Sequence, residues 1–180
     1  MKLRAENSCL VLIDVQGKLA QLMSARESLF RNIGILVKGC RKLSVPVLWC
    51  QQVPEALGET VEQIAGLLEG VEPVNKRSFS CWGDERFRSR LCELERSQVI
   101  LCGIESHVCV YQTATDLLGS GFEVHVARDA VSSRTAENRL AGLERMSRMG
   151  AHIGCVEMIL FEFLGSADHE MFREVAKLMK

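Results

Sequence analysis

Short apolar runs alternate with longer amphipathic stretches along most of this chain. The apolar runs are rich in Val, Ile and Leu, as expected for parallel strands that are buried on both faces of a sheet. They predict six strands, at Cys9–Val15, Pro46–Cys50, Val71–Asn75, Val99–Gly103, Glu123–Ala127 and His152–Val156. Between the strands, apolar residues recur at the i, i+3, i+4 spacing of one helix face. This spacing predicts helices at Ser28–Leu43, Thr60–Leu68, Asp84–Leu94, Ser106–Leu118 and Thr135–Met149.

The alternation of strands and helices predicts an α/β protein, a three-layer α/β/α sandwich with a mainly parallel, six-stranded, Rossmann-like sheet. No Pro-rich or Ser-rich linker interrupts it, so we expect residues 1–180 to form a single domain. Sheets of this kind bind ligands outside the carboxyl ends of their strands. We therefore expect the functional residues at those strand ends.

Charge and composition exclude several classes of protein. The chain carries 22 Lys and Arg against 23 Asp and Glu, a net charge of −1, so we expect no nucleic-acid partner. No apolar run approaches the roughly 20 residues of a membrane-spanning helix, and the first residues lack the apolar core of a signal peptide. We therefore expect no membrane contact and a cytoplasmic location. The eight cysteines form no C-x-x-C pair, which favours free thiols over disulfides or structural zinc.

Three residues near predicted strand ends could carry chemistry. Asp14 interrupts the first apolar run, where a charge needs a partner, either as a carboxylate that caps a nearby loop or as a catalytic acid or base. Cys109 follows the fourth strand in the first turn of a helix that Ser106 can cap, where the helix dipole and the backbone N–H groups favour a thiolate. Cys109 is equally compatible with simple packing at the helix start. Lys76 follows a short strand and either meets Asp14 and Cys109 or forms an ordinary solvated pair with Arg77.

The order and spacing of these segments resemble the isochorismatase-like cysteine hydrolase superfamily. The resemblance rests on Leu12-Ile-Asp-Val-Gln16, Asn75-Lys-Arg-Ser-Phe-Ser80 and Gly103-Ile-Glu-Ser-His-Val-Cys109, and it continues through Asp129–Arg134 and Cys155–Leu164. It covers most of the chain and is closest to the small isochorismatase-domain-containing proteins. Each short motif is weak alone, but their joint occurrence is specific.

The resemblance implies a catalytic triad in which Asp14 is the general base, Lys76 its cationic partner and Cys109 the nucleophile. It also implies a cis peptide bond between Ile104 and Glu105, with the N–H groups of Glu105 and Cys109 directed at a developing oxyanion. A cation beside Cys109 is expected to lower the pKa of its thiol. Four further residues are candidates for the substrate pocket, although aromatic residues beside a helix are often ordinary core: Gln16, Phe79, Trp82 and His107.

One departure from the superfamily concerns metal. Its nicotinamidases hold a metal ion with histidines between the second strand and the lysine, but Val47 to Lys76 contains no histidine here. The four histidines of the chain also lack the spacing of a local metal motif. We therefore expect no catalytic zinc, no other metal and no cofactor.

These expectations lead to two hypotheses of function. The first is a metal-independent cysteine hydrolase that cleaves an amide-like C–N bond of a small molecule through a thioester on Cys109. The alternative is a non-catalytic scaffold or regulatory binding protein that retains the fold. The apolar tail from Val156 to Met179 further predicts a homo-oligomer, a dimer or higher, unless Phe161, Phe163 and Leu164 only complete the core of one protomer.

Overall fold

A computed structural model describes residues 2–179, so Met1 and Lys180 of the predicted domain lie outside the described residues. Six strands form one sheet in the order β3-β2-β1-β4-β5-β6, and every neighbouring pair is parallel. Their bounds are β1 Ser8–Ile13, β2 Val47–Gln52, β3 Val74–Lys76, β4 Gln98–Ile104, β5 Glu123–Ser132 and β6 His152–Gly154. This is the Rossmann-type order, and it reverses direction between β1 and β4.

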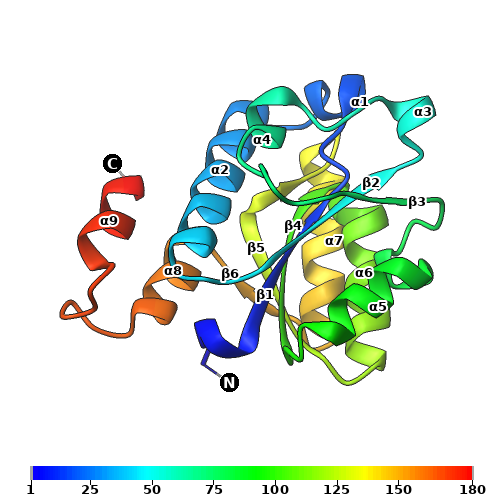
Figure 1. The fold of residues 1–180 in the computed structure, drawn as a ribbon. Coiled ribbons are helices and arrows are strands. Elements are labelled where there is room, and N and C mark those ends of the chain that lie inside the picture. The colour runs from blue at the N-terminus through cyan, green and yellow to red at the C-terminus, as the bar shows by residue number, and fades with distance from the viewer. Residues whose placement is uncertain (1, 180) are drawn as a thin grey trace.

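Helices cover both faces of the sheet, as Figure 1 shows. The longer ones are α2 Arg26–Lys42, α5 Glu85–Glu93, α6 Tyr111–Gly119, α7 Ala136–Arg148 and α8 Val156–Leu164. The short ones are α1 Gly17–Gln21, α3 Pro54–Leu57, α4 Glu62–Ala65 and α9 Phe172–Ala176. α2 and α8 pack on one face and α5, α6 and α7 on the other, which confirms the predicted three-layer architecture. No helix within residues 2–179 has the length and apolar character needed to cross a membrane.

Strand β1 shows how the sequence produces two cores. All six of its residues are buried, and alternate side chains point to opposite faces of the sheet. Leu10 and Leu12 join the core under α2 and α8, whereas Cys9, Val11 and Ile13 join the core under α5, α6 and α7. A near-continuous apolar run is therefore required here, because both faces are covered.

Several element boundaries differ from the predicted ones. Strand β1 ends at Ile13 rather than Val15, because Asp14 adopts a left-handed φ of 52°. The third strand begins at Val74, after Pro73, rather than at Val71. The helix predicted over Thr60–Leu68 is regular only at α4, and tighter i to i−3 hydrogen bonds continue the turn to Leu68.

Strand β5 continues five residues beyond its predicted end at Ala127. The polar residues of this extension are accommodated within the strand, and Asp129 Oδ1 accepts a hydrogen bond of 2.9 Å from the first amide of α8 at Val156. A register shift between Leu101 and Gly103 on β4 accompanies this extension. The longer strand brings Ser132 beside the segment that carries Cys109, where Ser106 Oγ donates to the Ser132 carbonyl.

Candidate active site

The side chains of Asp14, Lys76 and Cys109 converge at the carboxyl edge of the sheet. Asp14 directly follows β1, Lys76 is the last residue of β3, and Cys109 lies in the turn after β4. Lys76 Nζ is 2.7 Å from Asp14 Oδ2, and the Cys109 thiol is close enough to both for their charges to act on it. The convergence lies where the strand order reverses, the usual ligand site of this topology.

Asp14 is held by the backbone around it. Its N–H donates to the Cys50 carbonyl at 3.1 Å, and its carbonyl accepts from the Gln16 N–H at 2.8 Å. Only 2% of the residue is exposed. Oδ2 accepts from Lys76, whereas Oδ1 has no hydrogen-bond partner among the described residues. Leaving a buried carboxylate oxygen without a hydrogen-bond donor costs free energy. Oδ1 is therefore the atom of Asp14 that can accept a proton or a hydrogen bond from a ligand.

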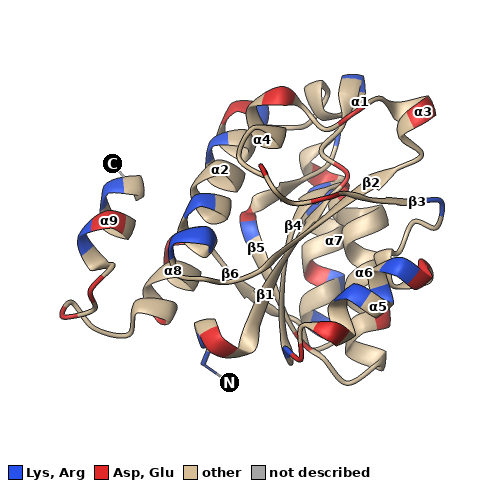
Figure 2. Cartoon of the chain, in the orientation of Figure 1, with Lys and Arg blue, Asp and Glu red and all other residues tan. Residues whose placement is uncertain are grey.

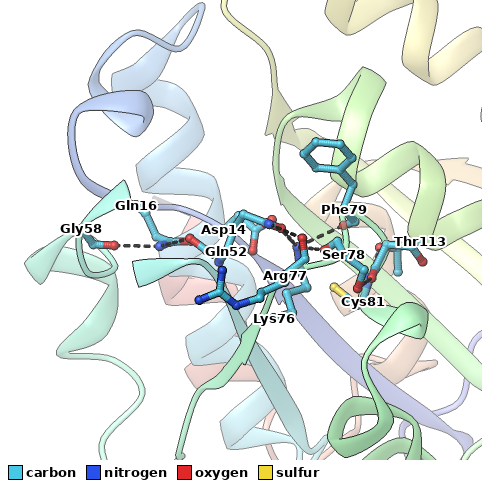
Figure 3. Close-up of polar contacts among 11 residues, drawn as sticks. Asp14, Gln16, Gln52, Gly58, Lys76, Arg77, Ser78, Phe79, Cys81 and Thr113 are labelled. Atoms are coloured by element: carbon cyan, nitrogen blue, oxygen red, sulfur yellow. Dashed lines mark hydrogen bonds and ion pairs between the residues drawn. The ribbon is translucent and has the colours of Figure 1, made fainter. Parts of the chain in front are cut away.

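Lys76 is the most constrained side chain of the site, as Figure 3 shows. Its Nζ donates to Asp14 Oδ2 and to Gln52 Oε1, both at 2.7 Å, and contacts the carbonyl oxygens of Phe79 at 3.0 Å and Ser78 at 3.2 Å. An ammonium has three protons, so four acceptors saturate it. Lys76 therefore has one fixed position, with its charge directed at Asp14.

Cys109 lies in a π-helical turn, Ser106–Val110, that precedes α6. Ser106 was expected to cap this helix, but it lies inside the turn and its hydroxyl donates to the Ser132 carbonyl at 3.0 Å. Helix α7 crosses the turn at Gly142, where an added Cβ would lie 2.6 Å from the Ser106 carbonyl oxygen. The turn is thus fixed from both sides, and its shape depends on a glycine in another helix.

The Ile104–Glu105 peptide bond directly before this turn is cis, at the position that the resemblance implied. The Glu105 carbonyl accepts hydrogen bonds from the N–H groups of Val108 and Val110 at 3.0 and 3.2 Å. Its carboxylate accepts from the backbone N–H of Arg134 at 2.9 Å and from the guanidinium Nε at 3.2 Å. Glu105 thereby connects the turn to the segment after β5.

Burial dominates the protonation of the site. Desolvation raises the pKa of Asp14 above its ordinary value of 3.8, although the positive charge of Lys76 opposes this. For Lys76, desolvation lowers the pKa, but the Asp14 charge and hydrogen bond, together with the neighbouring thiols, outweigh it and the net shift is upward. Desolvation and the Asp14 charge also raise the pKa of the Cys109 thiol, and Lys76 offsets only part of this. The positive charge of Lys76 does lower the pKa of the Cys109 thiol, as expected, but burial outweighs it and the net shift in the free site is upward.

Gln16 has a positioning role in the structure. Its Nε2 donates to the carbonyls of Gln52 at 3.1 Å and Gly58 at 2.7 Å, and its Oε1 accepts from the Gln52 N–H at 2.6 Å. These bonds join the segment after β1 to the end of β2 and to the loop after α3. The side-chain amide of Gln16 is thus occupied by backbone groups. Through these bonds Gln16 holds Gln52, and its own N–H donates to the Asp14 carbonyl.

The other candidate pocket residues lie in different surroundings. The Phe79 side chain is 54% exposed, and its ring projects away from Lys76 in Figure 3. Trp82 packs edge-to-face on Phe122, at a centroid distance of 5.5 Å, next to the amino end of β5. His107 Nδ1 is 3.0 Å from Ser133 Oγ. His107 thus lies within the turn that carries Cys109, whereas the Trp82 ring packs on Phe122.

Gln52 is a residue of the site that the sequence reasoning missed. It ends β2, two residues beyond the predicted strand end, and it therefore reaches the same sheet edge as Asp14. Its Oε1 accepts from Lys76, while its Nε2 donates to the Arg77 carbonyl at 2.7 Å. The amide thus fixes both the lysine and the loop after it. A polar residue at the end of an apolar strand was the available signal.

Comparison with known proteins identifies relatives over nearly the whole chain. The isochorismatase domain model matches residues 8–158. Isochorismatase domain-containing protein 2 of Danio rerio is 36% identical over 178 residues, covering 99% of this chain and 89% of that protein. The secreted isochorismatase effector Isc1 of Phytophthora sojae is 37% identical over 183 residues, covering 99% of this chain and 87% of that protein. The solved MAR1 ribonuclease structure of Caenorhabditis elegans superposes with a TM-score of 0.94 at 34% identity, covering 99% of this chain and 92% of that one.

Proposed function

This chain belongs to the isochorismatase family, a family of hydrolases, and we propose that it hydrolyses an amide-like C–N bond of a small molecule with Cys109 as nucleophile. The observation that carries the proposal is the buried 2.7 Å ion pair of Asp14 and Lys76 next to the Cys109 thiol. A base, a fixed cation and a nucleophile at one strand edge are the groups that acyl transfer requires.

The raised thiol pKa defines the first step. Cys109 keeps its proton in the free site, because burial and the Asp14 charge disfavour a thiolate. When a substrate carbonyl carbon approaches the sulfur, the S–H proton moves to Asp14 as the C–S bond forms. The carbonyl oxygen then becomes an oxyanion, which the N–H groups of Glu105 and Cys109 stabilise in our proposal.

Collapse of this tetrahedral species breaks the C–N bond. Asp14 returns its proton to the leaving nitrogen, and a thioester remains on Cys109. Water then attacks the thioester, Asp14 accepts a proton from that water, and the resulting acid leaves as the sulfur is protonated again. Lys76 keeps its proton throughout, because its four acceptors favour the ammonium even while Asp14 holds a proton. No step requires a metal ion.

The test is a screen of primary amides, ureas and related acyl compounds for ammonia or amine release. We expect activity in the wild type and in Cys102→Ala, which removes another fully buried thiol from β4. Cys109→Ala should lower activity by about 1,000-fold or more, because the covalent step is lost. Activity that survives in Cys109→Ala would refute the proposed nucleophile.

Metal independence is a separate part of the proposal. Activity should persist after dialysis of the protein against a chelator, because Asp14 and Lys76 already neutralise each other and no histidine lies near them between Val47 and Lys76. Loss of activity on dialysis, restored by zinc, would refute it. So would an absorption-edge difference map that places stoichiometric zinc beside Asp14.

A ribonuclease is the second candidate, because the solved Caenorhabditis elegans relative carries that name. The charge distribution argues for a small substrate instead. Lys and Arg are interspersed with Asp and Glu over the helices in Figure 2, and only 1%, 2% and 8% of Lys76, Asp14 and Cys109 are exposed. RNA binding depends on a basic surface that contacts phosphates. Degradation of a labelled RNA by the wild type but not by Cys109→Ala would favour this candidate over an amidase.

The third candidate is a binding protein without catalysis. It predicts that no compound in the screen is turned over, while compounds that fit the site still raise the melting temperature. Turnover that depends on Cys109 excludes it.

We also propose that the chain acts in a reducing compartment such as the cytoplasm. All eight cysteines are free thiols, and six of them are buried. Free buried thiols are typical of reducing compartments. The Phytophthora sojae relative, by contrast, is named a secreted protein. Fractionation of the source cells distinguishes the two locations.

A further inference from the structure

A second cluster of polar side chains lies at the opposite, amino end of strands β5 and β6. Glu123 and His125 stand two residues apart on β5, so their side chains point to the same face of the sheet. His152 begins β6 and is the register partner of His125. Three potential metal ligands from two strands therefore share one face, and their ligand atoms lie within 4.8 Å of one another.

The distances within the cluster suit one metal ion. Glu123 Oε1 is 2.9 Å from His125 Nε2 and 3.7 Å from His152 Nε2. The two imidazole rings stack, with centroids 4.7 Å apart and planes inclined by 27°. In a tetrahedral zinc site with bonds of about 2.0–2.1 Å, ligand atoms are separated by about 3.3 Å. The two oxygen–nitrogen distances bracket this separation, and the half-exposed His152 ring must turn out of the stack to direct a nitrogen at the same ion.

The carboxylate is oriented independently of any metal. Gln98 Nε2 donates to Glu123 Oε2 at 3.1 Å, leaving Oε1 directed at the histidines. Gln98 is itself fixed, because its Oε1 accepts from Ser8 Oγ at 3.2 Å and from the Arg4 N–H at 2.9 Å. In known metal sites, hydrogen bonds from residues that do not bind the metal hold the ligand side chains in place.

We propose that Glu123, His125 and His152 form a binding site for a late first-row divalent cation such as Zn²⁺. Two imidazole nitrogens and one carboxylate oxygen are a donor set typical of zinc. The His152 side chain is 49% exposed, which leaves solvent access to a fourth coordination position. From His125 to Ser132, beside the Cys109 turn, β5 extends by about 23 Å at roughly 3.3 Å per residue. The cation therefore lies far from Cys109 and is separate from the proposed catalysis.

Binding of the cation is expected to hold strand β6 on strand β5. Strand β6 has three residues and lies at the edge of the sheet, where it pairs with β5 alone. A cation shared by His125 and His152 would tie these strands at the first residue pair of their ladder. Because only the folded chain presents all three ligands together, the cation stabilises the folded state.

The test uses the full chain, stripped of metal with a chelator and titrated with Zn²⁺ by calorimetry. We expect one Zn²⁺ per chain and a higher melting temperature in its presence. His152→Ala removes a half-exposed ligand without opening the core, and should weaken binding about tenfold or more. His169→Ala is the matched control, because His169 lies outside the cluster and should leave binding unchanged.

Titration with Co²⁺ identifies the ligand atoms. A d–d spectrum without a thiolate charge-transfer band is expected for two imidazoles and a carboxylate. Three results would overturn the proposal: no binding at one equivalent of Zn²⁺, equal affinity in His152→Ala and the wild type, or a thiolate band. The last result would assign the metal to cysteine residues instead.

Discussion

Replacing Lys76 by Met tests the energetics of the candidate site without knowledge of its substrate. Asp14 and Lys76 form an ion pair of 2.7 Å in which the two side chains are 3% and 0% exposed. The variant removes the charge and keeps most of the side-chain volume. Asp14 is then left as a buried carboxylate without its cation, and Gln52 Oε1 and two carbonyls lose a donor.

The loss in the free energy of unfolding that Lys76→Met causes follows from the burial of the ion pair. Removing one partner of a buried pair costs about 3–5 kcal/mol, because the remaining charge stays desolvated. Arg77→Met is the matched control, since Arg77 makes an ion pair of the same length, 2.7 Å, with Glu55 on the surface. Their side chains are 81% and 60% exposed, and an exposed pair contributes about 0–1 kcal/mol. The two ion pairs have equal distances, but only Lys76 is buried and holds further acceptors, and both differences make Lys76→Met the costlier change.

The loss should also depend on pH. Without Lys76, desolvation raises the pKa of Asp14 further above its unfolded value. The folded state then binds more protons than the unfolded state, so the free energy of unfolding rises as the pH falls. The slope reaches about 1.4 kcal/mol per pH unit while Asp14 is protonated only in the folded state. When the pH falls from 8 to 5, we expect the difference in the free energy of unfolding between the wild type and Lys76→Met to shrink by at least about 1.4 kcal/mol.

Urea denaturation of the two variants and the wild type at pH 8 and pH 5 measures these differences. The double variant Asp14→Asn, Lys76→Met should be more stable than Lys76→Met at pH 8, because it removes the unpaired charge. The reasoning would be refuted if Lys76→Met cost no more than Arg77→Met. A loss that is equal at both pH values would refute the assignment to Asp14.

Three further predictions concern packing, reactivity and assembly. Gly142→Ala should lose about 1–3 kcal/mol of stability, because its Cβ would lie 2.6 Å from the Ser106 carbonyl oxygen, whereas Gly119→Ala meets no atom within 4 Å and should be tolerated; thermal melts compare them. Iodoacetamide at pH 8 should label exposed Cys92 before Cys109, since burial raises the pKa of the Cys109 thiol; faster labelling of Cys109, read by mass spectrometry, would contradict this. Light scattering should give a multiple of the 20.1 kDa chain mass, because Met158 and Phe161 of α8 are 54% and 39% exposed, and a concentration-independent monomer would disprove assembly.

The tail from Val156 to Met179 shows the limit of sequence reasoning about surfaces. Its apolar content predicts an interface, yet most apolar residues of α8 complete the core of the protomer, among them Phe163 and Leu164. Only Met158 and Phe161 remain substantially exposed. Helical spacing shows that a face is apolar, but it does not show what covers that face.

The thiol pKa is a similar case. A cation expected beside Cys109 suggests an activated thiolate, but the sign of the net pKa shift depends on burial and on a third group. Desolvation is the largest cause and raises the pKa of the Cys109 thiol, the Asp14 charge adds to this, and Lys76 offsets only part of it. Such a balance among three charges requires their positions in space.

By itself, the sequence determined the α/β/α architecture, because buried parallel strands and amphipathic helices leave distinct periodicities along the chain. It also indicated the sheet edge where Asp14, Lys76 and Cys109 meet, since parallel strands all end on one side. The tertiary structure decided the partners within that edge, such as Gln52 on Lys76. It likewise decided the pairing of His125 with His152, 27 residues apart, because strand register is set by packing across the whole sheet. Local pattern fixes the element to which a residue belongs, and long-range packing fixes which side chains touch.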